Sequence, residues 1–352
     1  MNTTTRRWYI KFLQWKTQYL THRQFILLLC GIVGIATGFA ALAMRSFTHF
    51  IEEVLVGNII QYINYGFYVI FPAMGFLLVY WVKKYIIRKD VSHGIPSILY
   101  AVAKQKGIMK RFQAYGSLLT APITIGFGGS VGLEGPMVVT GAGISSNIAR
   151  FFHINQSDRM LLLACACAAA LAAIFKVPLA GILFAIEVFG LDLTLSSLLP
   201  LFIASLSGVL TSYIFFGNAV LLPMNIHGTF LMRNIPFYLL LGLVGGVMSA
   251  YFTFVYERVN KFFSKFSSPY IRIAIGGATL GLLVFLMPPL YGEGHEIINH
   301  LKAGHPELSL SSNIFGWDLQ NPWIVILLLG GLVLFKVVAT SVTFGAGGVG
   351  GI

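Results

Sequence analysis

Long apolar segments that carry almost no charge are the feature that most constrains how this chain can fold. Phe25–Phe47 and Leu193–Phe216 each exceed the roughly 20 helical residues that cross a bilayer's hydrocarbon core. Only 10% of the residues are charged, against about 25% in soluble domains, and the mean hydropathy is +0.80. Alternating strands typical of an outer-membrane barrel are absent. The sequence therefore predicts an all-α integral membrane protein.

The net charge of +12 is concentrated in short segments between apolar runs. These segments contain Arg6, Arg7, Lys11, Lys16 and Arg23; Lys83, Lys84, Arg88, Lys89, Lys104, Lys106, Lys110 and Arg111; and Arg258, Lys261, Lys265 and Arg272. Basic loops mark the cytoplasmic side, so we expect a cytoplasmic N-terminus and a multi-pass protein of the bacterial plasma (inner) membrane. Anionic lipid accounts for the excess charge, and no nucleic-acid partner is expected. The N-terminus shows no signal-peptide pattern.

Apolar segments follow one another along the whole chain, and several are too short to span a membrane. The expected helices are Phe25–Phe47, Gly66–Trp81, Ser92–Val102, Phe112–Gly126, a helix following Pro136, Met160–Phe175, Val177–Phe189, Leu193–Phe216, Phe237–Tyr256, Ile271–Met287, Tyr291–Ala303 and Trp323–Thr343. Short segments interrupted by Gly or Pro indicate a transport site near the membrane midplane. The Ala-rich run Cys165–Ala173 favours close helix packing, and the odd count of three cysteines, all in apolar segments, favours packing over disulfides.

Two similarities between distant segments indicate an internal repeat. Phe25–Ala40 resembles Phe237–Phe252, with glycine cores 211 residues apart, and Phe127–Pro136 is echoed by Phe344–Ile352 at an offset of 217. The near-equal offsets predict a two-repeat transporter architecture with pore elements from both copies. We expect a cytoplasmic lead at 1–24, a first repeat at 25–220 and an incomplete second repeat at 221–352. The second copy stops where its equivalent helix should begin, so we expect the chain to be a truncated fragment.

The stretch Gly128–Pro136, GGSVGLEGP, places the single carboxylate of Glu134 among glycines just before a helix. Glycine allows close backbone approach, and proline suits the first turn of a helix. The N–H groups and positive dipole end of such a helix bind anions. A carboxylate at membrane depth is a functional hypothesis by default. The alternative is a loop glutamate that caps a helix in interfacial water.

Two further segments carry polar residues into apolar surroundings. SHGIP (92–96) is a second helix start, which ordinary N-capping by Ser92 also explains. Lys176 and Glu187 stand at the two ends of the apolar helix KVPLAGILFAIEVF. For Lys176, snorkelling at the helix end or an internal ion pair is the simpler interpretation.

With these motifs in order, the sequence resembles the CLC family of chloride channels and chloride/proton exchangers. The family's GSGIP, GREGP, PLAGILF-IEE and GGIFAP elements correspond here to SHGIP (92–96), GLEGP (132–136), VPLAGILFAIEV (177–188) and VGGI (349–352). The resemblance implies the CLC-type inverted-repeat bundle of tilted, partly broken helices. It also implies a homodimer with one pore per subunit.

The resemblance assigns roles to individual residues. Glu134 matches the gating glutamate, which occupies the anion path when deprotonated and opens it when protonated or displaced. The anion-binding residues implied are Ser92, His93, Gly94, Ile95, Gly132, Leu133, Gly135 and Ile352. Glu187 matches the first acid of the PLAGILF helix and marks a candidate proton path.

Two departures from the family pattern bear on the transported ion. His93 stands where the family has its pore serine, so Ser92 supplies a shifted hydroxyl or His93 offers a pH-sensitive N–H. Val188 stands where exchangers generally carry a second acid, as in the channel branch. The expected function is glutamate-gated transport of chloride or a similar anion, in the manner of a voltage-gated chloride channel. A proton-coupled antiporter, or a transporter of nitrate or fluoride, is the alternative.

Other classes of function fit the sequence less well. His295-Glu296 resembles the start of HExxH, but the next histidine, His300, is at +5 and leaves the helical face that a zinc site needs. No metal and no cofactor are therefore expected. An intramembrane enzyme would need a Ser–His or paired-Asp arrangement in the spans, which is absent, so no enzymatic activity is expected. A receptor or purely structural protein would not explain Glu134.

Overall fold

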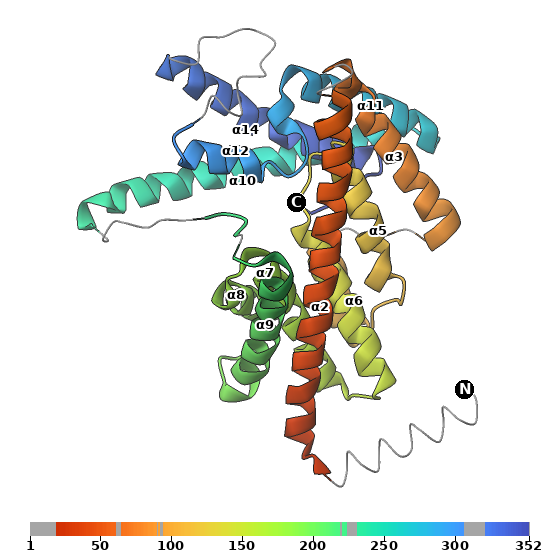
Figure 1. Ribbon diagram of the computed structural model, residues 1–352, viewed down its shortest axis with the longest axis vertical. Helices are drawn as coiled ribbons and strands as arrows, with labels where there is room; N and C mark the ends of the chain where they lie inside the picture. Colours follow the sequence, from red (N-terminus) through yellow and green to blue (C-terminus); the bar gives the residue numbers. More distant parts are fainter. Residues whose placement is uncertain are drawn as a thin grey trace. The chain divides into compact units, whose positions relative to one another are not determined.

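The computed structural model describes residues 19–60, 65–89, 91, 94–218, 220–223, 231–305 and 321–351. Within them the chain is helical (Figure 1). The α-helices are α2 (His22–Glu52), α3 (Phe71–Trp81), α4 (Gly94–Lys104), α5 (Gln113–Gly126), α6 (Glu134–Phe151), α7 (Gln156–Phe175), α8 (Pro178–Phe189), α9 (Leu195–Phe216), α10 (Ile235–Ser264), α11 (Pro269–Leu286), α12 (His295–Lys302) and α14 (Pro322–Gly345). Among the described residues, 6 helical segments are long and apolar enough to cross a membrane.

The helices lie where the apolar pattern predicted them, with two clear differences. Helix α10 continues past the expected end at Tyr256 to Ser264. The segment expected to be helical from Tyr291 begins only at His295, as α12. Gly292 and Gly294 have positive φ angles of 61° and 87°, which a helix does not contain, so residues 291–294 form a turn. The turn places Glu293 where its carboxylate accepts the N–H of Leu133.

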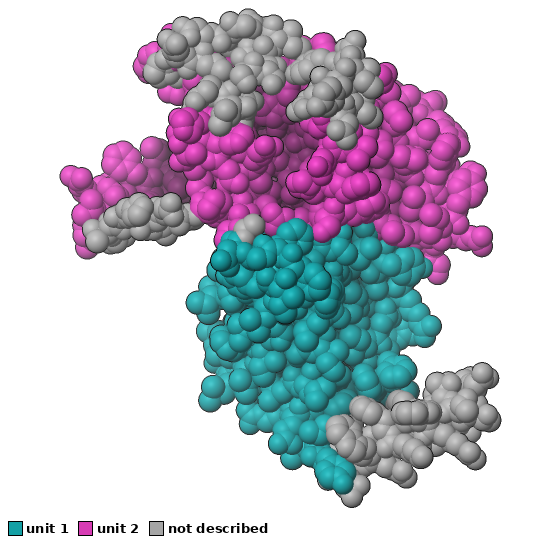
Figure 2. Space-filling model, in the orientation of Figure 1, with its two compact units in different colours: residues 1–43, 94–118, 137–219 teal, residues 44–93, 119–136, 220–352 magenta. Residues whose placement is uncertain are grey.

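The chain divides into two compact units, coloured separately in Figure 2. Unit 1 comprises residues 1–43, 94–118 and 137–219, and unit 2 comprises residues 44–93, 119–136 and 220–352. These units are defined by packing, whereas the expected division at 25–220 and 221–352 rests on sequence similarity. The division into repeats stays a prediction, and the expected cytoplasmic lead falls mostly on residues outside the described ones.

Unit 1 is built around α7, which packs against α8 and α9. Cys165, Cys167 and the alanines between and after them are fully buried. A Cβ on Gly181 of α8 would lie 2.3 Å from the carbonyl oxygen of Ala168, and one on Gly208 of α9 would lie 2.7 Å from that of Ala169. The predicted close packing of small residues is confirmed, and all three cysteines are free and buried.

The two glycine cores of the predicted repeat have different surroundings. In unit 1, a Cβ on Gly34 of α2 would lie 2.3 Å from the carbonyl oxygen of Ala204, so α2 and α9 are in backbone contact. In unit 2, Gly242 and Gly245 of α10 have nothing within 4 Å among the described residues. Similar sequences therefore have unlike packing environments.

Unit 2 places the glycine-rich segments on a frame of packed helices. In this unit α11 packs against α3 and α14, and α10 packs against α14. The core includes Phe76, Leu280, Val284 and Ala339, all buried. This frame fixes α14, whose C-terminal end leads directly into the second glycine-rich segment, 344–351.

Candidate anion site

The loop between α5 and α6 is held by hydrogen bonds from buried hydroxyl groups. The Thr343 hydroxyl of α14 accepts the N–H of Ser130 (3.2 Å), and the Thr340 hydroxyl donates to the Ser130 carbonyl (2.7 Å). The Thr124 hydroxyl of α5 accepts the N–H of Val349 (3.0 Å). Both glycine-rich segments are thus anchored to the same two helices of unit 2.

These anchors bring the two glycine-rich segments face to face. Gly132 and Gly351 form an antiparallel bridge, with N–H to O distances of 3.1 Å from Gly132 and 2.7 Å from Gly351. A Cβ on Gly351 would lie 2.7 Å from the backbone nitrogen of Gly135, so glycine is required at this close approach. The pairing expected from FGGSVGLEGP and FGAGGVGGI is confirmed at this position.

Glu134 is the first residue of α6, and its carboxylate folds back over the glycine loop. A Cβ on Gly132 would lie 2.1 Å from Oε2 of Glu134, so the absence of a side chain at Gly132 makes room for the carboxylate. The Glu134 side chain is 33% exposed. The carboxylate therefore rests at the start of a helix, where backbone N–H groups favour negative charge.

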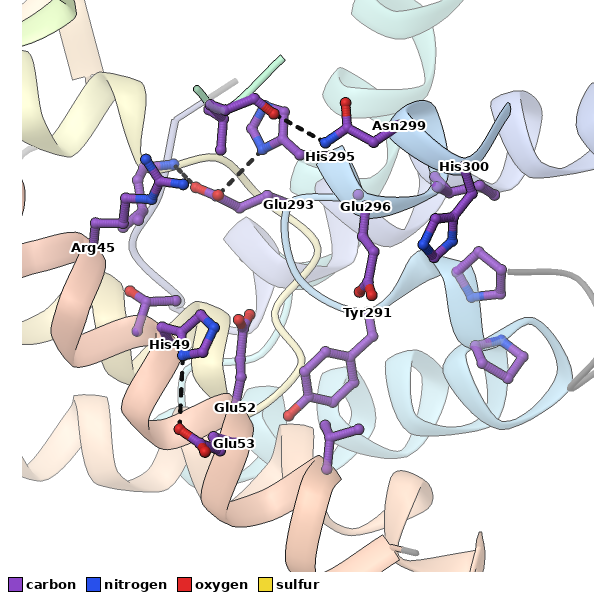
Figure 3. A pocket seen from close by; sticks show the side chains of 18 of the residues that line it. Arg45, His49, Glu52, Glu53, Tyr291, Glu293, His295, Glu296, Asn299 and His300 are labelled. Atoms are coloured by element: carbon purple, nitrogen blue, oxygen red, sulfur yellow. Dashed lines mark hydrogen bonds and ion pairs between the residues drawn. The ribbon is translucent and has the colours of Figure 1, made fainter. Parts of the chain in front are cut away.

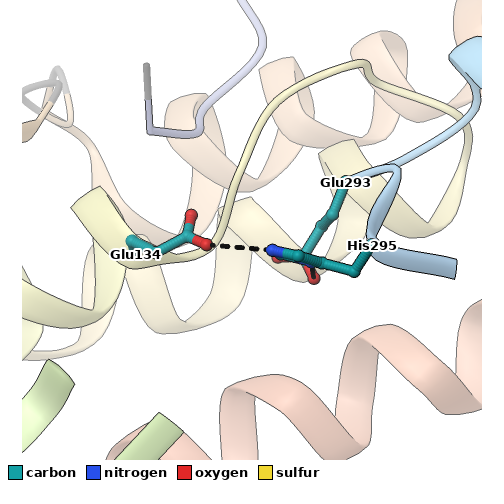
Figure 4. Close-up of side chains that lie close together, drawn as sticks. All are labelled: Glu134, Glu293 and His295. Atoms are coloured by element: carbon teal, nitrogen blue, oxygen red, sulfur yellow. Dashed lines mark hydrogen bonds and ion pairs between the residues drawn. The ribbon is translucent and has the colours of Figure 1, made fainter. Parts of the chain in front are cut away.

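His295, the first residue of α12, and Glu293, from the turn before it, lie close to Glu134 (Figure 4). Nε2 of His295 lies 3.6 Å from Oε1 of Glu134, an ion-pair distance when the imidazole is protonated. Nδ1 of His295 lies 3.2 Å from Oε2 of Glu293. The other oxygen of Glu293 accepts the N–H of Leu133 at 2.9 Å. His295 thus lies between the carboxylates of Glu134 and Glu293. The Glu293 carboxylate is also hydrogen-bonded to Leu133, the residue directly before Glu134.

The pKa values of these groups respond to burial and to one another. Burial raises the pKa of Glu134, and the negative charge of Glu293 raises it further; a backbone hydrogen bond at Glu134 and the charge of His295 oppose this rise. The hydrogen bond to Glu293 raises the pKa of His295. Burial lowers this pKa, the negative charges of Glu293 and Glu134 raise it, and the positive charge of Lys336 lowers it. The charges of Glu134 and His295 therefore each shift the pKa of the other.

A cavity of about 720 Å³ in unit 2 leads to this cluster (Figure 3). Leu133, Glu293 and His295 line one part of it. Other titratable or charged residues of the lining are Arg45, His49, Glu52, Glu53, Tyr68, Tyr291, Glu296 and His300. Carboxylates and histidines thus predominate among its charged groups, which is unexpected beside a site for anions.

One donor set in this cluster has the composition of a metal site. One ligand atom each from Glu134, Glu293 and His295 lies within 4.8 Å of the others. Two carboxylates and an imidazole are ligands that a transition metal accepts. The group contains neither Glu296 nor His300, so the spacing in HEIINH is unrelated to it. The expectation that the protein has no metal stays a prediction.

The remaining residues predicted for the site lie elsewhere or outside the described chain. Ser92, His93 and Ile352 are outside the described residues. Gly94 and Ile95 form the first turn of α4 in unit 1, where Gly94 has a φ of 62° and its carbonyl accepts the Ser97 hydroxyl (2.9 Å).

Lys176 and Glu187 also belong to unit 1. Glu187 is exposed on α8. The Lys176 ammonium donates to the Gly217 carbonyl and lies 4.7 Å from the ring centroid of Tyr213. Lys176 is therefore anchored by a carbonyl and an aromatic ring at the end of α7.

The sequence analysis missed Glu293 and His295 as partners of Glu134, although a signal was present. Glu293 is flanked by Gly292 and Gly294, just as Glu134 is surrounded by glycines. The apolar pattern predicts a helix over Tyr291–Ala303, and a helix there does not predict that Glu293 and His295 face Glu134. A carboxylate between two glycines is typical of a turn, and this pattern would have identified Glu293 as a candidate site residue.

Fold and site together define a class of protein: a multi-pass helical membrane protein with a carboxylate at a helix start where two glycine-rich segments meet. Residues 74–352 match the family described as "Voltage gated chloride channel". The chain belongs to this family.

The most similar relatives include both channels and exchangers by name. The voltage-gated ClC-type chloride channel ClcB of Citrobacter koseri is 30% identical over 199 residues, which are 56% of this chain and 48% of the relative. The H(+)/Cl(-) exchange transporter ClcA of Salmonella arizonae is 26% identical over 341 residues, 93% of this chain and 68% of the relative. The crystal structure of a CLC-type fluoride/proton antiporter has the same fold, with a TM-score of 0.71, 22% identity and coverage of 94% and 78%.

Proposed function

We propose that the protein carries chloride or a similar small anion across the membrane through a pore gated by Glu134. The observation that carries the proposal is the Glu134 carboxylate at the start of α6, lying over Gly132 where the two glycine-rich segments pair. A negative side chain at a helix N-terminus occupies a place that a free anion can take. Family membership and the names of the relatives support the same function.

In this mechanism the carboxylate and the anion compete. Deprotonated Glu134 stands in for the anion and blocks the path. Protonation removes its charge, so the anion gains the N–H groups at the helix start. Since burial raises the pKa of Glu134, this protonation occurs at a higher pH than in an exposed glutamate. Anion binding must remain weak enough for release. The process requires no chemical step, so we propose transport and no enzymatic activity.

Chloride efflux from liposomes that contain the intact protein tests the proposal. We expect efflux that is carried by the protein, rises with acidification and is absent from protein-free liposomes. Efflux no faster than in empty liposomes would contradict the proposal. Fluoride and nitrate, tested in the same assay, establish the anion preference, since one related structure is a fluoride/proton antiporter.

A second candidate mechanism is exchange of the anion for protons. Glu187 in α8 favours exchange, and Val188 in place of a second acid favours a channel. We propose a channel and expect no uphill proton movement when a chloride gradient is imposed on liposomes. Proton uptake at a fixed ratio to chloride would establish exchange instead. We further propose a homodimer in the bacterial plasma membrane, with a cytoplasmic N-terminus.

A further inference from the structure

A second carboxylate occupies a backbone donor beside the gate. Oε1 of Glu293 accepts the N–H of Leu133 at 2.9 Å, across 160 residues of sequence. Leu133 directly precedes Glu134, and its N–H belongs to the helix start that was expected to hold the anion. N–H groups at a helix start lack partners within the helix and are natural donors to anions. In this structure the donor is filled by a tethered carboxylate.

Several contacts hold Glu293 in this position. The turn that carries it needs positive φ at Gly292 and Gly294, and Lys336 of α14 donates to the Gly292 carbonyl at 2.7 Å. Oε2 of Glu293 contacts Nδ1 of His295 at 3.2 Å. Both carboxylate oxygens are thus engaged, and the side chain is only 20% exposed. The Leu133 contact is built into the fold of unit 2.

The charges around the contact between Glu293 and Leu133 favour displacement of the Glu293 carboxylate by an anion. Glu134 and Glu293 are both acidic and both face His295, which separates them. Lys336 adds a positive charge from α14. Two neighbouring carboxylates repel each other, so an anion arriving at the helix start competes against charges already present.

We propose that Glu293 is a second gating carboxylate, which competes with the transported anion for the Leu133 N–H. This inference rests on the proposed function and deepens it. The anion reaches that donor only after Glu293 leaves it, so Glu293 weakens anion binding and promotes release. His295 is a positioning residue that holds Glu293 against Leu133 and faces Glu134. A merely structural Glu293, which braces the turn, would leave anion affinity unchanged.

The test is isothermal titration of the intact purified protein with chloride, in EDTA so that no trace metal binds Glu134, Glu293 and His295. Glu293→Ala frees the Leu133 N–H, and we expect about tenfold tighter chloride binding, the equivalent of one charged hydrogen bond. Glu293→Gln keeps an acceptor oxygen but loses the charge, so we expect an intermediate affinity. The matched control is Glu296→Gln, which removes a carboxylate from the same cavity and should change affinity less than about twofold.

The same titration in a Glu134→Ala background separates the two carboxylates. There Glu293 is the remaining competitor, so Glu293→Ala should again tighten binding about tenfold. Unchanged or weaker binding in variants that retain the wild-type melting temperature would overturn the role of Glu293 while leaving Glu134 in place. If Glu293→Ala unfolds, the isosteric Glu293→Gln decides the question. Chloride binding in none of the proteins, including Glu134→Ala, would instead overturn the proposed function.

Discussion

At the scale of residues, the site consists of an imidazole between two carboxylates. His295 contacts Glu134 at 3.6 Å and Glu293 at 3.2 Å. The two neighbours act on Glu134 in opposite directions, since Glu293 raises its pKa and protonated His295 lowers it. Burial raises the pKa of Glu134 most, and two side chains outside its own helix then shift that pKa in opposite directions.

Replacing His295 should shift the pH dependence of anion flux toward higher pH. In His295→Gln, the positive charge that lowers the pKa of Glu134 is lost, so the carboxyl binds its proton at a higher pH. In the proposed mechanism protonated Glu134 admits the anion, so flux should begin to rise at a higher pH during acidification. Chloride efflux from liposomes, measured as a function of pH, gives the pH at which flux reaches half of its maximum, called here the pH midpoint.

His300→Gln is the matched control, because His300 lies on the same helix and lines the same cavity. Its pH midpoint should remain that of the wild type. A midpoint for His295→Gln that is unchanged or moves to lower pH would show that His295 does not influence the gate.

The position of Glu134 at a helix start among glycines could be predicted from sequence, because glycines followed by a proline indicate a turn that leads into a helix. Its role as an anion gate stays a prediction. Glu293 and His295 could not be placed by the same reasoning, because their role depends on a contact between segments 160 residues apart. The apolar pattern predicts a helix from Tyr291, whereas Gly292 and Gly294 form a turn, and no local pattern says what that turn faces.

At the scale of elements, apolar periodicity and composition gave reliable helix positions but not packing partners. The ends of α5, α7 and α8 fall within a few residues of those expected. The repeat similarity between α2 and α10 did not predict that Gly34 contacts α9 while Gly245 has no atom of the described residues within 4 Å. Burial depends on which neighbour is present, and a repeat does not specify that neighbour.

This difference predicts unequal effects of the same substitution at equivalent glycines. Gly34→Ala places a Cβ 2.3 Å from a backbone oxygen of Ala204, so the helices must separate, at a cost of about 1–3 kcal/mol. Gly245→Ala meets no atom within 4 Å and should change stability by less than about 1 kcal/mol. Thermal unfolding in detergent compares the two. An equally large loss at Gly245 would show that this face of α10 is covered in the intact protein.

At the scale of the whole molecule, the proposed cytoplasmic N-terminus predicts which end of the first span faces outward. The helical segment His22–Gly57 is long enough to cross the membrane, and its C-terminal part, from Arg45 to Gly57, lines the acidic cavity of unit 2. With a cytoplasmic N-terminus, we expect this C-terminal part on the outer side of the membrane.

Labelling from outside the cell tests this orientation. The three native cysteines are buried, whereas the Glu53 side chain is 70% exposed. We expect Glu53→Cys to react with a membrane-impermeant maleimide applied to intact spheroplasts. Lys110→Cys, in a basic loop expected to be cytoplasmic, should react only after permeabilisation. The reverse pattern would place the N-terminus outside.

The pH profile of chloride flux through Glu134→Gln tests the central claim most directly. Glutamine keeps the size of the side chain but carries no charge at any pH, so it resembles a permanently protonated gate. In liposomes that contain the intact protein, we predict flux at neutral pH at least as fast as that of acid-activated wild type, and largely independent of pH. Flux that retains the wild-type pH dependence would contradict the assignment of Glu134 as the gate.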